Sequence, residues 1–217
     1  NSTANSGREG IGVVVLGSTG SVGQSTLDVM KRHPGRYRVV ALTAHGSVRE
    51  LAAQCHTHDA RYAVISDPSR TDELAAALAE LDCGARVLSG PEALLEVVSL
   101  DETEVVMAAI VGAAGLPPTL QAARLGKRLL LANKESMVIA GALFEQARRE
   151  SGAQIVPVDS EHNALFQALP AEFHGELRFH GGLRACGVER LTLTASGGPF
   201  LHAAAKQLAS VTPEQAC

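Results

Sequence analysis

The stretch Gly10-Ile-Gly-Val-Val-Val-Leu16, followed directly by Gly17-Ser-Thr-Gly-Ser-Val-Gly23, decides the fold class of this chain. An apolar run of this length is typical of a central strand in a parallel sheet whose two faces are covered by helices. Amphipathic residues continue to about Lys31 and predict a helix after the glycine turn. A strand, a glycine turn and a helix in this order favour a phosphate site, because backbone N–H groups and a helix N-terminus then face one point. The alternative is a turn with only a structural role.

The same alternation continues along the chain. Short β-branched runs and Ala/Leu-rich amphipathic runs follow one another, which predicts an α/β fold with a Rossmann-like, doubly wound parallel sheet. After Val158 the pattern changes, and we expect the beginning of a second, α+β catalytic domain that is truncated. The expected division is a flexible tail at 1–10, a nucleotide-binding domain at 11–158 and the second domain at 159–217. Further strands are expected at 38–42, 61–65, 86–88, 104–110, 128–131 and 154–158, then a helix at 160–169, a loop or hairpin at 173–187, a strand at 189–195 and a helix start at 212–214.

Composition excludes several classes of protein. Hydrophobic residues make up 46% and charged residues 19% of the 217 residues, so general disorder is excluded. The net charge of −4 and an aromatic content of 3% argue against a nucleic-acid partner. Since no apolar run reaches the roughly 20 residues that span a bilayer, we expect no membrane segment. The widely spaced cysteines predict reduced thiols in a cytoplasmic setting, and they are Cys55, Cys83, Cys186 and Cys217.

The end of the expected second strand bears on the choice of dinucleotide. NAD sites usually carry an Asp or Glu there, which binds the ribose hydroxyls. No carboxylate occurs from Ala41 to Arg49, and His45 and Arg49 are both potential cations. This pattern favours NADP, since a carboxylate would repel its 2′-phosphate. The alternative for Arg49 is an ordinary position on a solvated helix face.

Three polar groups follow expected strands, at the sheet edge where ligands bind in such folds. Asp159 and Glu161 offer hard oxygen ligands suited to Mg²⁺ or Mn²⁺, or else they belong to a helix N-cap. Lys134 could bind a phosphate or a carbonyl oxygen, or it could be a surface lysine. Ser196, before two glycines, could bind an anion or form an ordinary turn. The three groups are Asn133-Lys134-Glu135, Asp159-Ser-Glu-His-Asn163 and Ser196-Gly-Gly198.

Five ordered segments resemble one known family. These segments resemble, in the same order, parts of the 1-deoxy-D-xylulose 5-phosphate reductoisomerase family, the NADPH-dependent enzymes of the non-mevalonate isoprenoid pathway. The resemblance covers residues 11–217. The segments are Gly17–Gly23, Met107–Leu116, Leu131–Ser136, Val158–Ala164 and Ser196–Phe200.

The resemblance implies a function and a set of site residues. The implied function is the isomerisation of 1-deoxy-D-xylulose 5-phosphate, a small sugar phosphate, and its NADPH-dependent reduction to 2-C-methyl-D-erythritol 4-phosphate. It also implies a bound Mg²⁺, Mn²⁺ or Co²⁺ and, at full length, a homodimer. Lys134 and Glu161 would be the catalytic residues, and Asp159 and Glu161 two metal ligands. NADPH contacts are implied for Thr19, Gly20, Ser21, Val22, Asn133 and Glu135, and substrate contacts for Lys134, Ser160, Glu161 and Ser196.

The sequence departs from the family pattern in two places. The family often has Gly-Lys-Asn after the second strand, in contact with the NADPH phosphate, where this chain has His45-Gly46-Ser47. The family also continues beyond the point that matches Cys217, so we interpret the chain as a fragment that is inactive alone. Two alternatives are another NADP-dependent reductase, such as a semialdehyde dehydrogenase, and a nucleotide-binding module without catalysis. The former needs a catalytic cysteine context that we do not find, and the latter predicts NADPH binding that is indifferent to metal.

Overall fold

The computed structural model describes residues 10–169, 184, 187–192 and 198–216. The chain divides into two compact units, residues 1–159 and 160–217. The first unit contains the whole sheet, and the second consists of short helices over its described part. These are α7 (Ser160–Ala168), η3 (Gly198–Phe200), η4 (Ala205–Ser210) and α10 (Pro213–Ala216).

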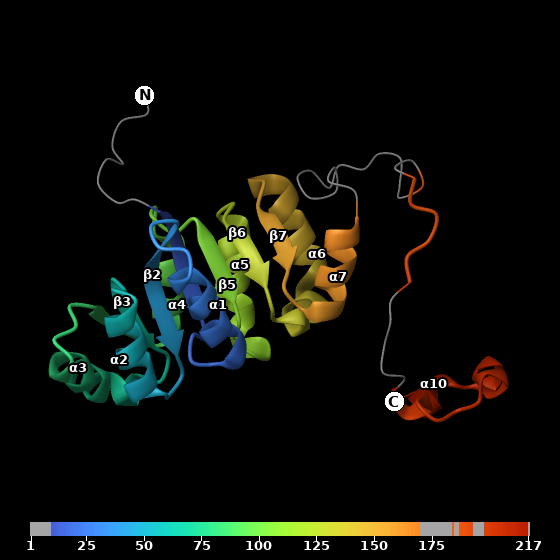
Figure 1. Cartoon of the computed structure of the whole chain (residues 1–217), viewed down its shortest axis with the longest axis horizontal. Helices are drawn as coiled ribbons and strands as arrows, with labels where there is room; N and C mark the ends of the chain where they lie inside the picture. Colours follow the sequence, from blue (N-terminus) through green and yellow to red (C-terminus); the bar gives the residue numbers. More distant parts are fainter. Residues whose placement is uncertain (1–9, 170–183, 185–186, 193–197, 217) are drawn as a thin grey trace. The chain divides into compact units, whose positions relative to one another are not determined.

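The first unit is built on a seven-stranded sheet in which every pair of neighbouring strands is parallel. The strand order is β4-β3-β2-β1-β5-β6-β7 (Figure 1). The chain therefore builds outward from β1 to β4, crosses back, and builds outward again from β5 to β7. The strands are β1 (Ile11–Leu16), β2 (Tyr37–Ala44), β3 (Tyr62–Ile65), β4 (Arg86–Ser89), β5 (Val105–Ala108), β6 (Arg128–Leu131) and β7 (Gln154–Pro157).

Helices cover both faces of the sheet, as the apolar central strands require. Alternate residues of β1 enter two separate cores. Val13 and Val15 pack with residues of the first three helices, and Val14 and Leu16 pack with residues of the next three. The helices are α1 (Ser21–Lys31), α2 (Val48–Thr57), α3 (Thr71–Glu80), α4 (Pro91–Ser99), α5 (Leu116–Arg124) and α6 (Lys134–Ser151), with short 3₁₀ turns η1 (Pro68–Arg70) and η2 (Ala113–Gly115).

The amino edge of the sheet is closed by a charge cluster. Glu102 lies between two arginines, with its Oε2 2.9 Å from Arg38 Nη1 and its Oε1 bonded to Arg61 Nη1. Burial raises the pKa of Glu102, but the charges and hydrogen bonds of the two arginines outweigh it and hold the pKa below its usual value. A Cβ added to Gly12 would lie only 1.9 Å from the Glu102 carbonyl oxygen. This edge is therefore tightly packed, and its carboxylate is paired within the protein.

The strand order places a topological switch point between β1 and β5. In open parallel sheets, ligands bind outside the carboxyl ends of the strands at such a point. The loop after β1 is the glycine stretch 17–20, and the loop after β5 is the stretch 109–112, which ends at Gly112. The fold therefore brings two glycine-containing loops to the position where a ligand is expected.

The predicted Rossmann-like parallel sheet is confirmed, with all seven strands present. The strand expected at 189–195 is wrong over its described part, because residues 189–192 are irregular. Alternating residues there find no neighbouring strand among the described residues of the second unit, and an unpaired strand leaves its backbone groups unsatisfied. Most of the loop or hairpin expected at 173–187, and residues 193–195, lie outside the described residues. Within the described ranges, no helix has the length and apolar character needed to cross a bilayer.

Candidate functional site

The glycine loop has a conformation that only glycine allows at two positions. Gly17 has a φ of +79°, and a Cβ on it would lie 2.9 Å from the Ala109 carbonyl oxygen. A Cβ on Gly23 would lie 2.4 Å from the Gly17 carbonyl oxygen, so the first turn of α1 packs directly on the loop. The first turn of α1 contains no acidic residue, and its N-cap, Gly20, has no side chain to cap it. This arrangement fits the pyrophosphate of a dinucleotide, since an anion can approach the N–H groups closely.

Hydrogen bonds hold the loop against the end of β2. The backbone N–H of Gly17 donates to Thr43 Oγ1 at 2.9 Å, and that of Ser18 donates to the Thr43 carbonyl at 2.8 Å. The buried hydroxyl of Ser18 donates to Gln54 Oε1 of α2 at 2.7 Å. The loop is thus fixed by side chains that do not face the ligand position. Of the residues predicted to contact NADPH here, Gly20 and Ser21 are exposed and Thr19 and Val22 half-buried.

Asn133 joins the second loop of the site to the start of α6. Its Nδ2 donates to the carbonyls of Ile110 (2.7 Å) and Gly112 (2.9 Å), and its Oδ1 accepts from the Ser136 N–H (3.0 Å). The side chain is 2% exposed. A Cβ on Gly115 would lie 2.6 Å from Asn133 Nδ2, so this glycine provides the space for the amide. Asn133 therefore shapes the loop after β5, and its contact with NADPH stays a prediction.

Two of the predicted site residues, Lys134 and Asp159, form an ion pair. Lys134 Nζ, in the first turn of α6, lies 3.1 Å from Asp159 Oδ2, just after β7. The lysine side chain is 59% exposed and the aspartate side chain 16%. Glu135 beside it is exposed. The carboxyl edge therefore presents a cation and a carboxylate in contact, on two neighbouring elements.

The second unit holds the remaining predicted ligands. In α7 the Ser160 hydroxyl donates to Glu161 Oε2 at 2.7 Å, and both residues are exposed. Ser196 lies outside the described residues. The carboxylates of Asp159 and Glu161 have the donor chemistry that Mg²⁺ prefers. Over the described ranges, however, no three His, Cys, Asp or Glu side chains gather as a metal site, and metal binding by Asp159 and Glu161 stays a prediction.

The loop after β2 contains a contact that sequence reasoning missed. His45 is exposed, and its Nδ1 lies 2.9 Å from Ser66 Oγ, while Arg49 is exposed on α2. Arg70, from the turn after β3, donates through Nη1 to the Gly46 carbonyl. The only sequence signal was a basic residue five positions after the end of β3, which by itself did not point to the loop after β2. Arg70 therefore joins the candidate site from a different part of the chain.

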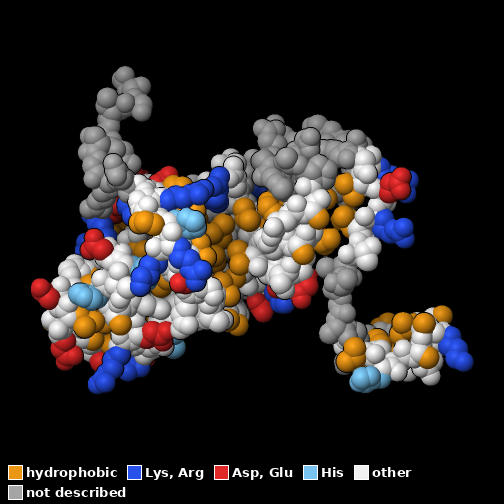
Figure 2. Space-filling model, viewed as in Figure 1, with side chains coloured by type: hydrophobic (Ala, Val, Ile, Leu, Met, Phe, Trp, Pro, Cys, Tyr) orange, Lys and Arg blue, Asp and Glu red, His pale blue; other side chains and the backbone are white. Residues whose placement is uncertain are grey.

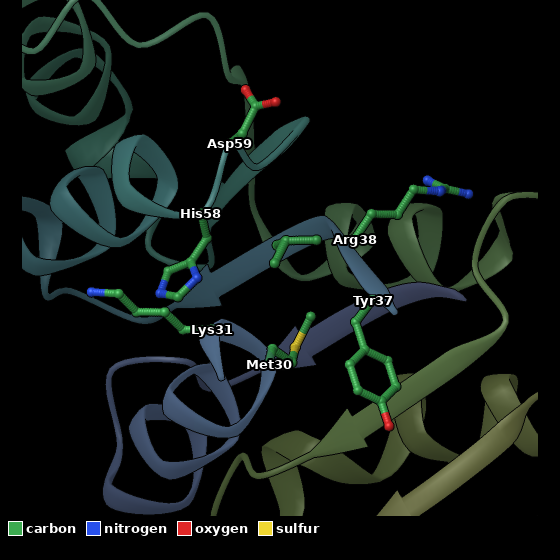
Figure 3. Close-up of a pocket in the computed structure, with 7 residues that line it drawn as sticks. Met30, Lys31, Tyr37, Arg38, His58 and Asp59 are labelled. Atoms are coloured by element: carbon green, nitrogen blue, oxygen red, sulfur yellow. The ribbon is translucent and has the colours of Figure 1, made fainter. Parts of the chain in front are cut away.

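A pocket at the opposite edge of the sheet lies far along the strands from these residues. It has a volume of about 260 Å³ and is lined by the end of α1, the start of β2 and the end of α2. Figure 3 shows Lys31 and His58 close together beside it, and Asp59 directed away. Burial and the charge of Lys31 lower the pKa of His58. This pocket belongs to the amino edge and contributes nothing to the candidate site.

The glycine loop at the switch point of a parallel sheet defines an α/β protein of the Rossmann, nucleotide-binding class. The family model of 1-deoxy-D-xylulose 5-phosphate reductoisomerase matches residues 13–141, and the model of the C-terminal domain of the same enzyme matches residues 155–217. The chain therefore belongs to the 1-deoxy-D-xylulose 5-phosphate reductoisomerase family.

Curated relatives and solved structures agree with this assignment. The enzymes of that name from Dechloromonas aromatica and Methylococcus capsulatus are each 54% identical over 94% of this chain, which covers 50% and 51% of them. The chain thus spans about half the length of these relatives. The Zymomonas mobilis enzyme in complex with NADPH is 44% identical with a TM-score of 0.79, covering 95% of this chain and 51% of that one. A structure titled as a complex with NADPH, fosmidomycin and magnesium is 41% identical, with a TM-score of 0.81, covering 94% of this chain and 50% of that one.

Proposed function

We propose that the protein to which this chain belongs converts 1-deoxy-D-xylulose 5-phosphate to 2-C-methyl-D-erythritol 4-phosphate, using NADPH and a divalent metal. The observation that carries the proposal is the glycine loop at the switch point, within a chain that is 54% identical to enzymes of this name. The fosmidomycin complex of a relative supports a small phosphate-like ligand. Since the chain spans half of its relatives, the complete reaction is proposed for the full-length protein.

NADPH would lie across the loops after β1 and β5. When bound, it supplies the hydride for the reduction step. Backbone N–H groups from Thr19 to Val22 would bind its pyrophosphate at the start of α1. Asn133 would keep the loop after β5 in the conformation that receives the cofactor, through its bonds to Ile110 and Gly112. Glu135 would provide a further polar contact at the same edge.

Asp159 and Glu161 would hold the divalent metal together with oxygens of the substrate. The metal, Mg²⁺, Mn²⁺ or Co²⁺, supplies positive charge that polarises the substrate ketone and hydroxyl. Lys134 would orient the substrate as a point charge, and its ion pair with Asp159 keeps its ammonium group at this edge. Ser160, Glu161 and Ser196 would contact the substrate.

The decisive experiment measures NADPH oxidation by the full-length protein with 1-deoxy-D-xylulose 5-phosphate, with and without Mn²⁺. We expect metal-dependent turnover that Asp159→Asn reduces by at least about a hundredfold, because a ligand and a charge are lost. Asp28→Asn, an exposed carboxylate on α1, is the matched control and should leave turnover unchanged. NADPH binding without any metal-dependent turnover would favour the nucleotide-binding module instead.

We also propose that the full-length protein is a cytoplasmic homodimer without a nucleic-acid or membrane partner. Cys55 and Cys83 are free in the structure, which suits a reducing compartment. Over the visible face of the α1–α3 region, acidic and basic side chains are interspersed, unlike the broad basic surface of a nucleic-acid-binding protein (Figure 2). The mass of the full-length protein in solution, measured by light scattering, tests the dimer.

A further inference from the structure

The loops that follow β2 and β3 are joined into one surface at the carboxyl edge. The β2–β3 pairing continues past the end of the strands, since the Ser66 N–H donates to the Ala44 carbonyl at 2.9 Å. Three more contacts follow in register: Asp67 N–H to the His45 carbonyl at 3.3 Å, His45 Nδ1 with Ser66 Oγ at 2.9 Å, and Arg70 Nη1 to the Gly46 carbonyl. A residue that follows β3 is therefore held directly against the loop that follows β2.

The guanidinium of Arg70 is fixed in orientation. Glu73 binds it on one edge, with Nε to Oε2 at 2.9 Å and Nη2 to Oε1 at 2.9 Å. The opposite nitrogen, Nη1, carries the bond to the Gly46 carbonyl. The side chain of Arg70 is 38% exposed, so its remaining N–H groups are within reach of solvent and of a ligand. A planar donor group held in this way suits the recognition of a phosphate.

Gly46 makes room for this guanidinium. A Cβ at residue 46 would lie 3.3 Å from Arg70 Nη1 and 3.9 Å from its Cδ, so a longer side chain would compete for the same volume. The guanidinium of Arg70 therefore occupies the space beside the Gly46 backbone that a side chain at residue 46 would otherwise fill.

The loop after β2 is also where Rossmann proteins distinguish their two dinucleotides. An Asp or Glu at this position binds the ribose of NAD, whereas an arginine nearby accommodates the 2′-phosphate of NADP. Of the acidic neighbours, Glu73 pairs with Arg70 itself, and two others have partners elsewhere. The Asp67 carboxylate accepts from the N–H and hydroxyl of Ser69, and Glu50 accepts from Gln24 Nε2 at 2.6 Å. His45 and Arg49 are exposed on the same loop and on the helix that follows it.

From these contacts we propose that Arg70 binds the 2′-phosphate of NADPH in this chain and so sets its preference for NADPH over NADH. The phosphate contact is supplied across the β2–β3 boundary rather than from the loop after β2 itself. Glu73 is a positioning residue, because it acts through the guanidinium. This inference rests on the proposed function, since it concerns the cofactor of the same site.

The test compares the affinities of the full-length protein for NADPH and NADH, measured by fluorescence titration of the nicotinamide. These two ligands differ only in the 2′-phosphate. Arg70→Ala should weaken NADPH about ten- to a hundredfold, as expected for a charge-assisted hydrogen bond, and leave NADH within about twofold. The salt dependence of NADPH binding should also become shallower. Arg32→Ala removes an exposed arginine that pairs with Asp28 at the other end of α1, and should change neither affinity.

A second variant tests whether residues 46 and 70 serve the same phosphate. Adding Gly46→Lys to Arg70→Ala should restore most of the NADPH preference, because it places a cation on the loop that Arg70 contacts. The proposal would be overturned if Arg70→Ala left the ratio of the NADPH and NADH affinities unchanged, whether or not both affinities fall. It would also be overturned if the double variant showed no recovery. Failure of the unaltered full-length protein to bind NADPH would instead refute the proposed function.

Discussion

The two edges of the sheet carry similar residues for different purposes. The amino edge has Gly12, two arginines and Glu102, and the carboxylate there is paired with both arginines within the protein. The carboxyl edge has Gly17 and Gly23, Lys134 and Asp159, and a helix N-terminus without a capping side chain. Glycine and charge are thus present at both ends of the same strands. The two edges differ in exposure: the Arg38–Glu102 pair is largely buried, whereas Lys134 and the start of α1 are open to solvent.

Substitution of the glycines at the two edges should therefore have different consequences, and these are the largest effects we expect. Stability should be lost at the amino edge, and NADPH binding at the carboxyl edge. Gly12→Ala places a Cβ 1.9 Å from the Glu102 carbonyl, and should lower the free energy of unfolding by about 3 kcal/mol or more. Gly23→Ala displaces the glycine loop and should abolish measurable NADPH binding. Chemical denaturation and NADPH titration of both variants test this. Equal loss of binding in both, at matched stability, would remove the distinction between the edges.

Removing the carboxylate of the amino edge should produce the next largest effect. Glu102→Gln leaves Arg38, whose side chain is 17% exposed, without its counter-charge and should cost about 2 kcal/mol of stability. Because the folded pKa of Glu102 is lowered, its contribution is complete above the usual value of 4.5 and is lost as the pH falls through the folded pKa. The stability difference between the two proteins should shrink below about pH 4.5, as measured by urea denaturation across pH. A difference that grows on acidification would contradict this assignment.

Asn133 is an exception in the comparison of the two edges, because it is a buried structural residue at the carboxyl edge. Asn133→Ala removes the cap of α6 and two bonds to the loop after β5, and should cost about 2 kcal/mol. Asn133→Asp is the matched variant, since it keeps the cap acceptor and loses the two donors. It should retain part of the stability and still weaken NADPH binding. Wild-type NADPH affinity in Asn133→Asp would show that the loop needs no such support.

The smallest effect on stability should come from Lys134. Its ion pair with Asp159 is half open to solvent, so Lys134→Gln should change the free energy of unfolding by less than about 0.5 kcal/mol. Thermal unfolding measures this. In the full-length protein the same variant should strongly reduce turnover. Lys134 should therefore affect activity and not stability, whereas Glu102 should affect stability. A large loss of stability would place Lys134 with the structural residues.

The sequence alone predicted the sheet because its signals were local. The apolar run of β1, the glycine turn and the repeating alternation each lie within one element or one turn, and the residues from Val13 to Leu16 are all buried as expected. Helix α6 begins at Lys134 because Asn133 caps it. The strand at 189–195 was predicted from alternation only, and alternation cannot show whether a partner strand exists.

The site was predictable to the extent that it follows single strands. Asn133, Lys134 and Asp159 stand at strand ends, and sequence placed them at one edge. Arg70 was missed because its contact with Gly46 depends on how β2 and β3 are aligned across an intervening helix. The hydrogen bonds by which Asn133 holds the loop after β5 were missed for the same reason. Its partners Ile110 and Gly112 precede it by more than twenty residues. Contacts between loops need the register of the sheet, which no local pattern contains.

The position of β1 at the centre of the sheet has a consequence for the assembly of the protein. Val13 pairs with Val105 of β5, which is 92 positions later in the chain. The N–H of Gly12 donates to Glu104, which is also 92 positions later. During synthesis, the half of the sheet from β1 to β4 is therefore complete while one side of its most apolar strand still exposes unpaired backbone groups. Until β5 emerges from the ribosome and docks, this open side is the part of the nascent chain most exposed to pairing with another molecule.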